Sequence, residues 1–181
     1  DLQTSLFGQS VSNPPESRGV GVFKQLWSGL FFSAGLVTQD GEVTDCGRFA
    51  PDWCAAYSTA AADGVLTDKA RELMAASSPA SITDRISVPT LLGGGQSDSL
   101  FPLAQTSANA EQISAANETV KVVWHAGGHD GGVDEGDRLR ELNAEWFSFH
   151  LADGPEVTNA FDAPLVEGSA FGEQGTTDTE L

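Results

Sequence analysis

Two ionisable side chains, Asp98 and His129, each follow a short apolar run that ends in glycines. The first run covers Val88 to Leu92 and the second covers Val120 to Trp124. A buried strand that stops in a Gly-rich turn can hold the next polar side chain at the edge of a sheet. An Asp in such a place orients a His, which takes a proton from a nucleophile. The two residues therefore predict the acid and the base of a nucleophilic triad.

The stretch between Asp98 and His129 is long enough for one helix and one strand. Two adjacent parallel strands would bring these side chains together beyond their carboxyl ends, where α/β proteins bind ligands. The order acid, then His, is that of α/β-hydrolases. A second interpretation remains open: Asp98 could instead cap the following helix by accepting hydrogen bonds from the amides of Leu100 or Phe101.

The other histidines compete poorly with His129 for the role of base. His125 lies within or just after the strand, where we expect it to pack or to bond locally, whereas His129 follows two glycines and can be presented openly. His125 and His129 have the spacing of helical zinc ligands, but the glycines between them disfavour a helix. We therefore expect neither a metal nor a cofactor. His150 lies beside the apolar stripe of the last helix and is expected to be structural.

An acidic loop follows His129. It does not fit a calcium loop, because Gly132 and Glu135 stand where an oxygen ligand and a glycine are required. We expect residues 134–137 to supply negative charge at the start of the next helix. Asp130 could orient His129 or form a salt bridge in the core.

The third residue of the predicted triad, the nucleophile, is not found in this sequence. A serine nucleophile of this fold sits in a Gly-x-Ser-x-Gly turn, and that pattern does not occur in the 181 residues. The nearest segment, Gly95 to Ser99, lacks the final glycine and carries Asp98. Other serines lie in loop or helix contexts: Ser10, Ser28 and Ser33.

Composition excludes several classes of partner. The net charge is −17, from 26 acidic against 9 basic residues, and such a surface repels nucleic acid and anionic lipid. No apolar run reaches the roughly 18 residues of a membrane span, and no signal peptide is visible. Cys46 and Cys54 have no second cysteine pair, which disfavours zinc. A local disulfide and two free thiols both remain open.

The chain divides into three zones. Residues 1–86 carry helical patterns, at about Val22 to Phe31, Trp53 to Ala62 and Asp68 to Ala76, and are expected to form a cap or lid. Residues 87–153 alternate strand and helix, which predicts parallel pairing with a right-handed crossover. Two parallel strands are too few for a stable sheet, so this zone should be the end of a larger one. Residues 154–181 are interpreted as an acidic linker or tail.

Several stretches together resemble the Xaa-Pro dipeptidyl-peptidase and cocaine-esterase group of α/β-hydrolases. The stretches cover about residues 1 to 150: Asp1 to Phe7, Cys46 to Phe49 with Cys54, Ser77 to Ala80, Val88 to Leu92 with Asp98 to Pro102, and Trp124 to Gly132. Position 125, a histidine here, is more often aromatic in the group. The resemblance implies the C-terminal portion of an α/β-hydrolase parallel sheet with a helical cap insertion.

The resemblance also implies a serine hydrolase, a peptidase or esterase that acts on small-molecule or peptide acyl substrates. Asp98 would be the triad acid and His129 the base. The nucleophile and oxyanion donors would precede residue 1, and a jelly-roll domain would follow Gly154 to Val157, so that this fragment alone would be inactive. The aromatic residues Trp27, Phe31 and Phe32 would shape a substrate pocket or simply pack in a core.

Two rival functions remain. The chain could be a non-catalytic binding or interaction module of hydrolase ancestry. It could also belong to a metal-dependent hydrolase that uses His125, His129 and Asp130. The substrate's identity, the oligomeric state and the compartment are not indicated by these residues.

Overall fold

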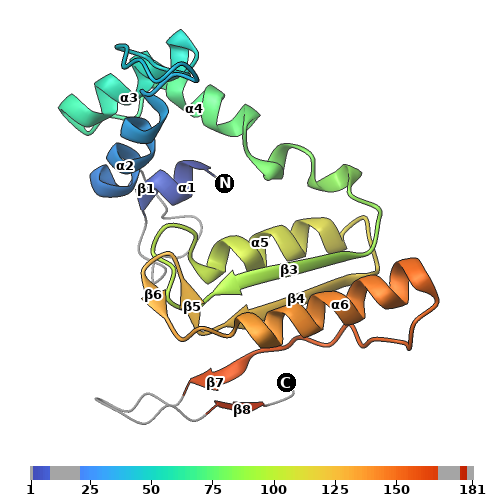
Figure 1. The fold of residues 1–181 in the computed structure, drawn as a ribbon. Coiled ribbons are helices and arrows are strands. Elements are labelled where there is room, and N and C mark those ends of the chain that lie inside the picture. Colours follow the sequence, from blue (N-terminus) through green and yellow to red (C-terminus); the bar gives the residue numbers. More distant parts are fainter. Residues whose placement is uncertain (1, 9–20, 167–175, 179–181) are drawn as a thin grey trace. The chain divides into compact units, whose positions relative to one another are not determined.

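A computed structural model describes residues 2–8, 21–166 and 176–178 (Figure 1). The chain divides into two compact units, residues 1–81 and 82–181. The first boundary lies a few residues before the end of the zone 1–86 that the sequence suggested. Each unit is described by itself.

The first unit is mainly helical. Its elements are α1 (Leu2–Leu6), β1 (Phe7–Gly8), β2 (Val22–Phe23), α2 (Gln25–Gly35), α3 (Pro51–Asp63), α4 (Asp68–Ala76) and the 3-10 helix η2 (Pro79–Ser81). The three expected helices are present. However, α2 begins at Gln25 and not at Val22, because Val22 and Phe23 pair antiparallel with β1.

Local signals account for the ends of α3 and α4. Pro51 occupies the first turn of α3, where its missing N–H costs no hydrogen bond. Gly64 ends α3 with φ 67°, a left-handed conformation that glycine adopts without a Cβ penalty. The hydroxyl of Thr67 caps α4 by accepting a hydrogen bond from the amide of Ala70.

The core of the first unit gathers around Phe7, which is fully buried. Buried residues from α3, α4 and the turn between them pack with it: Ala60, Leu66, Ala70 and Met74. The ring of Phe7 also lies 5.0 Å from that of Phe23, across the β1–β2 pair. A disulfide joins Cys46 to Cys54, which resolves the alternative that the sequence left open.

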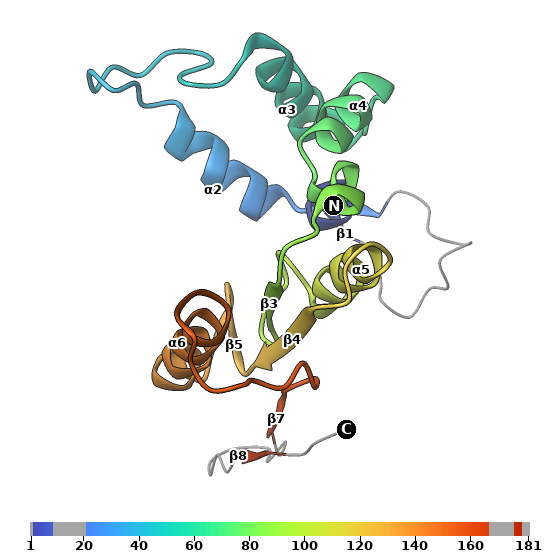
Figure 2. The ribbon, with the colours of Figure 1, turned by 90° about the vertical axis from the view of Figure 1, so that its right-hand side faces the viewer.

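The second unit mixes strands and helices around a parallel pair. Its elements are η3 (Thr83–Arg85), β3 (Thr90–Gly95), α5 (Leu103–Ser114), β4 (Val120–His125), β5 (Gly127–Gly128), β6 (Gly131–Gly132), α6 (Gly136–Ala152), β7 (Pro164–Val166) and β8 (Thr176–Asp178). Strands β3 and β4 are parallel, with register from Thr90↔Val120 to Gly95↔His125. Helices α5 and α6 lie on opposite sides of this pair (Figure 2). The unit is thus α/β in the broad sense.

Strand β3 runs further than its apolar run suggested. The sequence placed its end at Leu92, but Gly93 to Gly95 continue the ladder. Close packing explains two of these three glycines. A Cβ atom on Gly94 would lie 2.7 Å from Oγ1 of Thr106 on α5, and one on Gly95 would lie 2.4 Å from the carbonyl oxygen of Gly127. The Gly-rich segment therefore belongs to β3, where α5 and β5 pack closely against it. The turn begins only after Gly95.

The chain after α6 returns to β4. Asp162 forms a parallel bridge with Val123: its carbonyl accepts from the Trp124 amide at 2.7 Å, and its own amide donates to Val122 at 3.0 Å. The ring of Phe161 meets that of Trp124 edge-on at 4.9 Å. The first part of the expected tail thus extends the parallel pair by one short segment.

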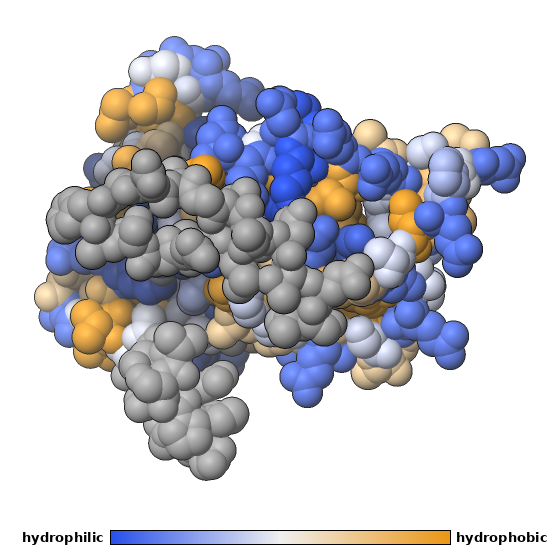
Figure 3. Space-filling model, turned by 90° about the horizontal axis from the view of Figure 1, so that it is seen from below, coloured by the Kyte–Doolittle hydropathy of each residue, from blue (hydrophilic) through white to orange (hydrophobic). Residues whose placement is uncertain are grey.

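The surface drawn in Figure 3 is mostly hydrophilic, with smaller hydrophobic patches between the polar side chains. Among the described residues, no helix has the length and apolar character needed to cross a membrane. Within the same residues, no group of three or more His, Cys, Asp or Glu side chains is arranged to hold a metal ion.

Candidate catalytic site

Asp98 and His129 are in contact. Oδ2 of Asp98 lies 2.7 Å from Nδ1 of His129. Asp98 follows the end of β3 and His129 follows β5, and the register of β3 and β4 brings these two ends side by side. A carboxylate can only accept, so we assign the shared proton to Nδ1 of the imidazole. The two side chains thus lie within hydrogen-bond distance, as the acid–base pair requires.

The second oxygen of Asp98 bonds to the amides that the rival interpretation named, but it does not cap a helix, because α5 begins only at Leu103 and has no side-chain cap. Oδ1 accepts from the backbone amides of Leu100 at 3.0 Å and Phe101 at 2.7 Å. One oxygen of the carboxylate thus bonds to the turn after Asp98, and the other contacts His129. The two turn amides fix the orientation of the carboxyl group, so that Oδ2 is held toward His129.

Burial and hydrogen bonds act in opposite directions on the Asp98 carboxyl group. Burial raises its pKa, but the hydrogen bonds from His129 and the Phe101 amide, with the attraction of His129, outweigh this effect. The net pKa of Asp98 lies below its ordinary value of 3.8. Asp98 is therefore an anion at neutral pH. Its side chain is 9% exposed, whereas that of His129 is 44% exposed.

Two turns must approach closely for this contact to form. A Cβ atom on Gly128 would lie 2.1 Å from the carbonyl oxygen of Ser97, so only glycine fits there. The Ser97 amide donates to Gly127 at 3.1 Å, and its hydroxyl donates to the carbonyl of Ala126 at 2.9 Å. These bonds tie the turn after β3 to the turn after β4.

Asp130 plays neither of the two roles suggested for it. Its carboxylate accepts from the amide of Ser99 at 2.5 Å and from the Ser99 hydroxyl at 2.8 Å. The pairs Asp98–His129 and Ser99–Asp130 thus form two successive links between the same two turns. The Ser99 hydroxyl donates within the second link and the Ser97 hydroxyl donates to the Ala126 carbonyl, so both serines support the turns.

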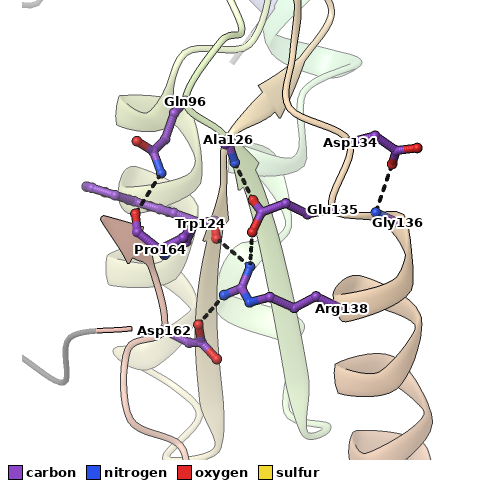
Figure 4. A network of polar contacts seen from close by, with 9 residues as sticks. All are labelled: Gln96, Trp124, Ala126, Asp134, Glu135, Gly136, Arg138, Asp162 and Pro164. Atoms are coloured by element: carbon purple, nitrogen blue, oxygen red, sulfur yellow. Dashed lines mark hydrogen bonds and ion pairs between the residues drawn. The ribbon is translucent and has the colours of Figure 1, made fainter. Parts of the chain in front are cut away.

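A second polar network holds the other end of the histidine turn (Figure 4). Glu135, at the start of α6, accepts from the amide of Ala126 at 2.5 Å and from Nη1 of Arg138 at 3.2 Å. Arg138 also donates to the carbonyl of Trp124 at 3.4 Å and to the carboxylate of Asp162. The network joins β4, α6 and the returning segment around the residues that precede His129.

Sequence reasoning missed this network. The residues 134–137 were expected only to place negative charge at the start of α6, yet the Glu135 side chain points back to Ala126. The signal available was the spacing of Glu135 and Arg138, an acid and a base three positions apart on a helix. Nothing local indicated that Asp162, in the expected tail, completes the network.

The remaining sequence candidates lie apart from the Asp–His contact. His125 ends β4, and its carbonyl accepts from the Gln96 amide at 2.8 Å. His150 packs between the rings of Trp146 and Phe149, with centroids 4.3 and 4.7 Å away. The ring of Phe101 lies 5.5 Å from that of His129 and covers it in part.

Comparisons with known proteins give no relative: no protein-family profile, no curated protein and no solved structure matches the chain.

Proposed function

We propose that the Asp98–His129 pair is the acid–base half of a Ser-His-Asp triad in a serine hydrolase of the α/β-hydrolase fold. The carrying observation is the contact of Asp98 Oδ2 with His129 Nδ1 while Oδ1 is held by two amides. In such a triad the acid binds Nδ1, which leaves Nε2 as the nitrogen that takes the proton from the nucleophile.

Each residue has a definite task in this proposal. Nε2 of His129 accepts the hydroxyl proton as the nucleophile attacks an acyl carbonyl, and later returns it to the leaving group. Asp98 remains ionised, holds the imidazole in the Nδ1–H tautomer and stabilises the imidazolium. Its lowered pKa supports this task, because a carboxylate that stays charged can stabilise a developing positive charge.

The arrangement of strands and helices in the second unit is consistent with part of an α/β-hydrolase sheet. In the proposal, β3 and β4 are the last strands of the hydrolase sheet, and the first unit is its helical cap. The parallel pairing of β3 and β4 and the helices on both sides of them are consistent with that role. The nucleophile and the oxyanion donors would come from chain outside these 181 residues, since no Gly-x-Ser-x-Gly turn occurs within them. The substrate would be a peptide or small acyl compound, with Xaa-Pro peptides as the first class to test.

The decisive experiment uses the chain extended toward its N-terminus and a serine-reactive fluorophosphonate. We expect labelling of one serine, with a labelling rate that falls at least about a thousandfold in His129→Ala. The matched control is His125→Gln, which should label like the parent. Equal loss in both histidine variants would reject His129 as the base. An extended chain that labels nowhere would reject the hydrolase and favour the non-catalytic module.

A second experiment tests the orientation of His129 in the 181-residue chain itself. Nitrogen NMR distinguishes the two neutral tautomers of an imidazole. We expect the proton on Nδ1 in the parent and a shift toward the Nε2–H tautomer in Asp98→Asn, because the asparagine amide can donate to Nδ1. The same tautomer in both proteins would contradict the assigned hydrogen bond.

A further inference from the structure

The first unit contains an apolar pocket of about 150 Å³. Its walls come from α1, β1, β2 and the three longer helices, and most of the aromatic side chains in them are half-buried: Phe23, Phe32, Phe49, Trp53 and Tyr57. Phe31, one of the suggested pocket residues, also lines it. Trp27 stacks on Phe31, with ring centroids 6.2 Å apart.

One wall of the pocket is built rigidly. The ring of Phe32 stacks between those of Tyr57, at 3.8 Å, and Phe49, at 4.9 Å. Phe49 lies directly on α2, where a Cβ atom on Gly35 would come within 2.1 Å of its ring. The Cys46–Cys54 disulfide holds the segment that carries Phe49 against α3. The wall therefore exists before any ligand arrives.

One polar side-chain atom lies in the wall of this apolar pocket. Ser28 on α2 lines the pocket, is only 7% exposed, and its Oγ atom has no hydrogen-bond partner among the residues that the structure describes. A buried hydroxyl without a partner costs free energy. Ligand sites in proteins commonly combine apolar walls with one or two such polar groups, which orient the ligand.

We propose that this pocket binds a small aromatic molecule with a single ring and one hydrogen-bonding substituent, which pairs with Oγ of Ser28. The size fits, because an apolar cavity of about 150 Å³ accepts a ligand as large as benzene. The aromatic side chains that line the pocket give it the apolar surface that an aromatic ligand contacts. The inference uses residues of the first unit alone and does not depend on the proposed catalytic pair.

The test compares phenol with toluene on the oxidised 181-residue chain. The two probes have nearly the same shape, but only phenol can bond to Ser28. By ligand titration monitored with NMR, we expect both to bind saturably, with phenol about five- to tenfold tighter, the size of one net hydrogen bond. Ser28→Ala should bind toluene as before and lose the preference for phenol.

A second variant is designed to fill the pocket. Ala56 lines the pocket and is half-buried on α3, so Ala56→Leu should abolish binding of both probes while circular dichroism stays unchanged. The inference is overturned if neither probe binds the parent saturably, which would mean that chain packing fills the pocket. It is also overturned if the preference for phenol is absent in the parent or survives in Ser28→Ala, or if Ala56→Leu, with its circular dichroism unchanged, binds both probes like the parent.

Discussion

The backbones of Gly128 and Ser97 touch: a Cβ atom on Gly128 would lie 2.1 Å from the Ser97 carbonyl oxygen and 2.6 Å from the Asp98 amide. The atoms in the way are backbone, which cannot move aside as a flexible side chain would. The turn that carries His129 can therefore reach Asp98 only because position 128 has no side chain. The glycines of the two turns thus have a steric role as well as a conformational one.

Gly128→Ala should consequently separate the turns. We expect a loss of about 1–3 kcal/mol in the free energy of unfolding, the usual cost of forcing a methyl group into packed space, together with loss of the Nδ1–H tautomer of His129. Urea unfolding and nitrogen NMR measure the two effects. Gly93→Ala is the control, since a Cβ atom there would meet nothing within 4 Å. If both alanine variants behave alike, the close approach does not govern the pair.

The lowered pKa of Asp98 predicts a pH dependence of stability. A carboxyl group whose pKa is lower in the folded than in the unfolded chain stabilises the fold above the unfolded value, here 3.8. This stabilisation is lost as the pH falls through the folded pKa. The free energy of unfolding of the parent should therefore fall more steeply than that of Asp98→Asn as the pH is lowered below about 5. If the free energies of unfolding of the two proteins fall in parallel with pH, the contact of Asp98 with His129 does not stabilise the fold.

Arg138 and Arg140 offer a matched pair of substitutions on one helix. Arg138 joins Glu135, Asp162 and the Trp124 carbonyl, and its side chain is only 25% exposed. Arg140 pairs with Asp137, and both of those side chains are largely exposed. Arg138→Ala should cost about 1–3 kcal/mol of unfolding free energy, because it removes the cation from the buried carboxylate of Glu135 and the half-buried carboxylate of Asp162. Arg140→Ala should change it little. Chemical unfolding followed by Trp fluorescence compares them.

The longer helices and the two parallel strands could be predicted because each of them has a local signal. Pro51, Thr67 and the apolar runs before Asp98 and His129 gave the helix starts and the strands almost in place. The end of β3 was misjudged because Gly94 and Gly95 are shaped by residues distant in the chain, on α5 and β5. Only three-dimensional packing explains a glycine that lies within a strand.

The candidate site was predictable in its residues and not in its supports. Asp98 and His129 carry recognisable chemistry after recognisable strands, so their contact could be expected. Asp130 has the same chemistry but bonds to Ser99. Sequence alone does not say which of the two acids, Asp98 or Asp130, turns toward His129. Asp162 joins the network from a segment with no strand pattern. Long-range contacts of this kind leave no local pattern.

The disulfide makes the stability of the first unit sensitive to reductant. Cross-linking Cys46 and Cys54 restricts the unfolded chain, and for a loop this short the expected stabilisation is about 2–3 kcal/mol. A Cys46→Ser/Cys54→Ser double variant should lose about this amount, whether or not reductant is present. The parent should lose it only on reduction. Thermal unfolding with and without reductant tests this, and a parent that is indifferent to reductant would contradict it.

Ser28→Ala should stabilise the protein when no ligand is bound. Alanine favours a helix over serine by up to about 0.5 kcal/mol. Here the change also removes a buried hydroxyl that lacks a partner within the described part of the chain, worth about 1 kcal/mol or more. Ser58→Ala on α3 is the control: it makes the same helical exchange, but its hydroxyl donates to the Cys54 carbonyl at 2.9 Å. The difference between the two variants in urea unfolding therefore isolates the hydroxyl of Ser28. If Ser28→Ala gains no more than Ser58→Ala, the Ser28 hydroxyl already has a partner in solution.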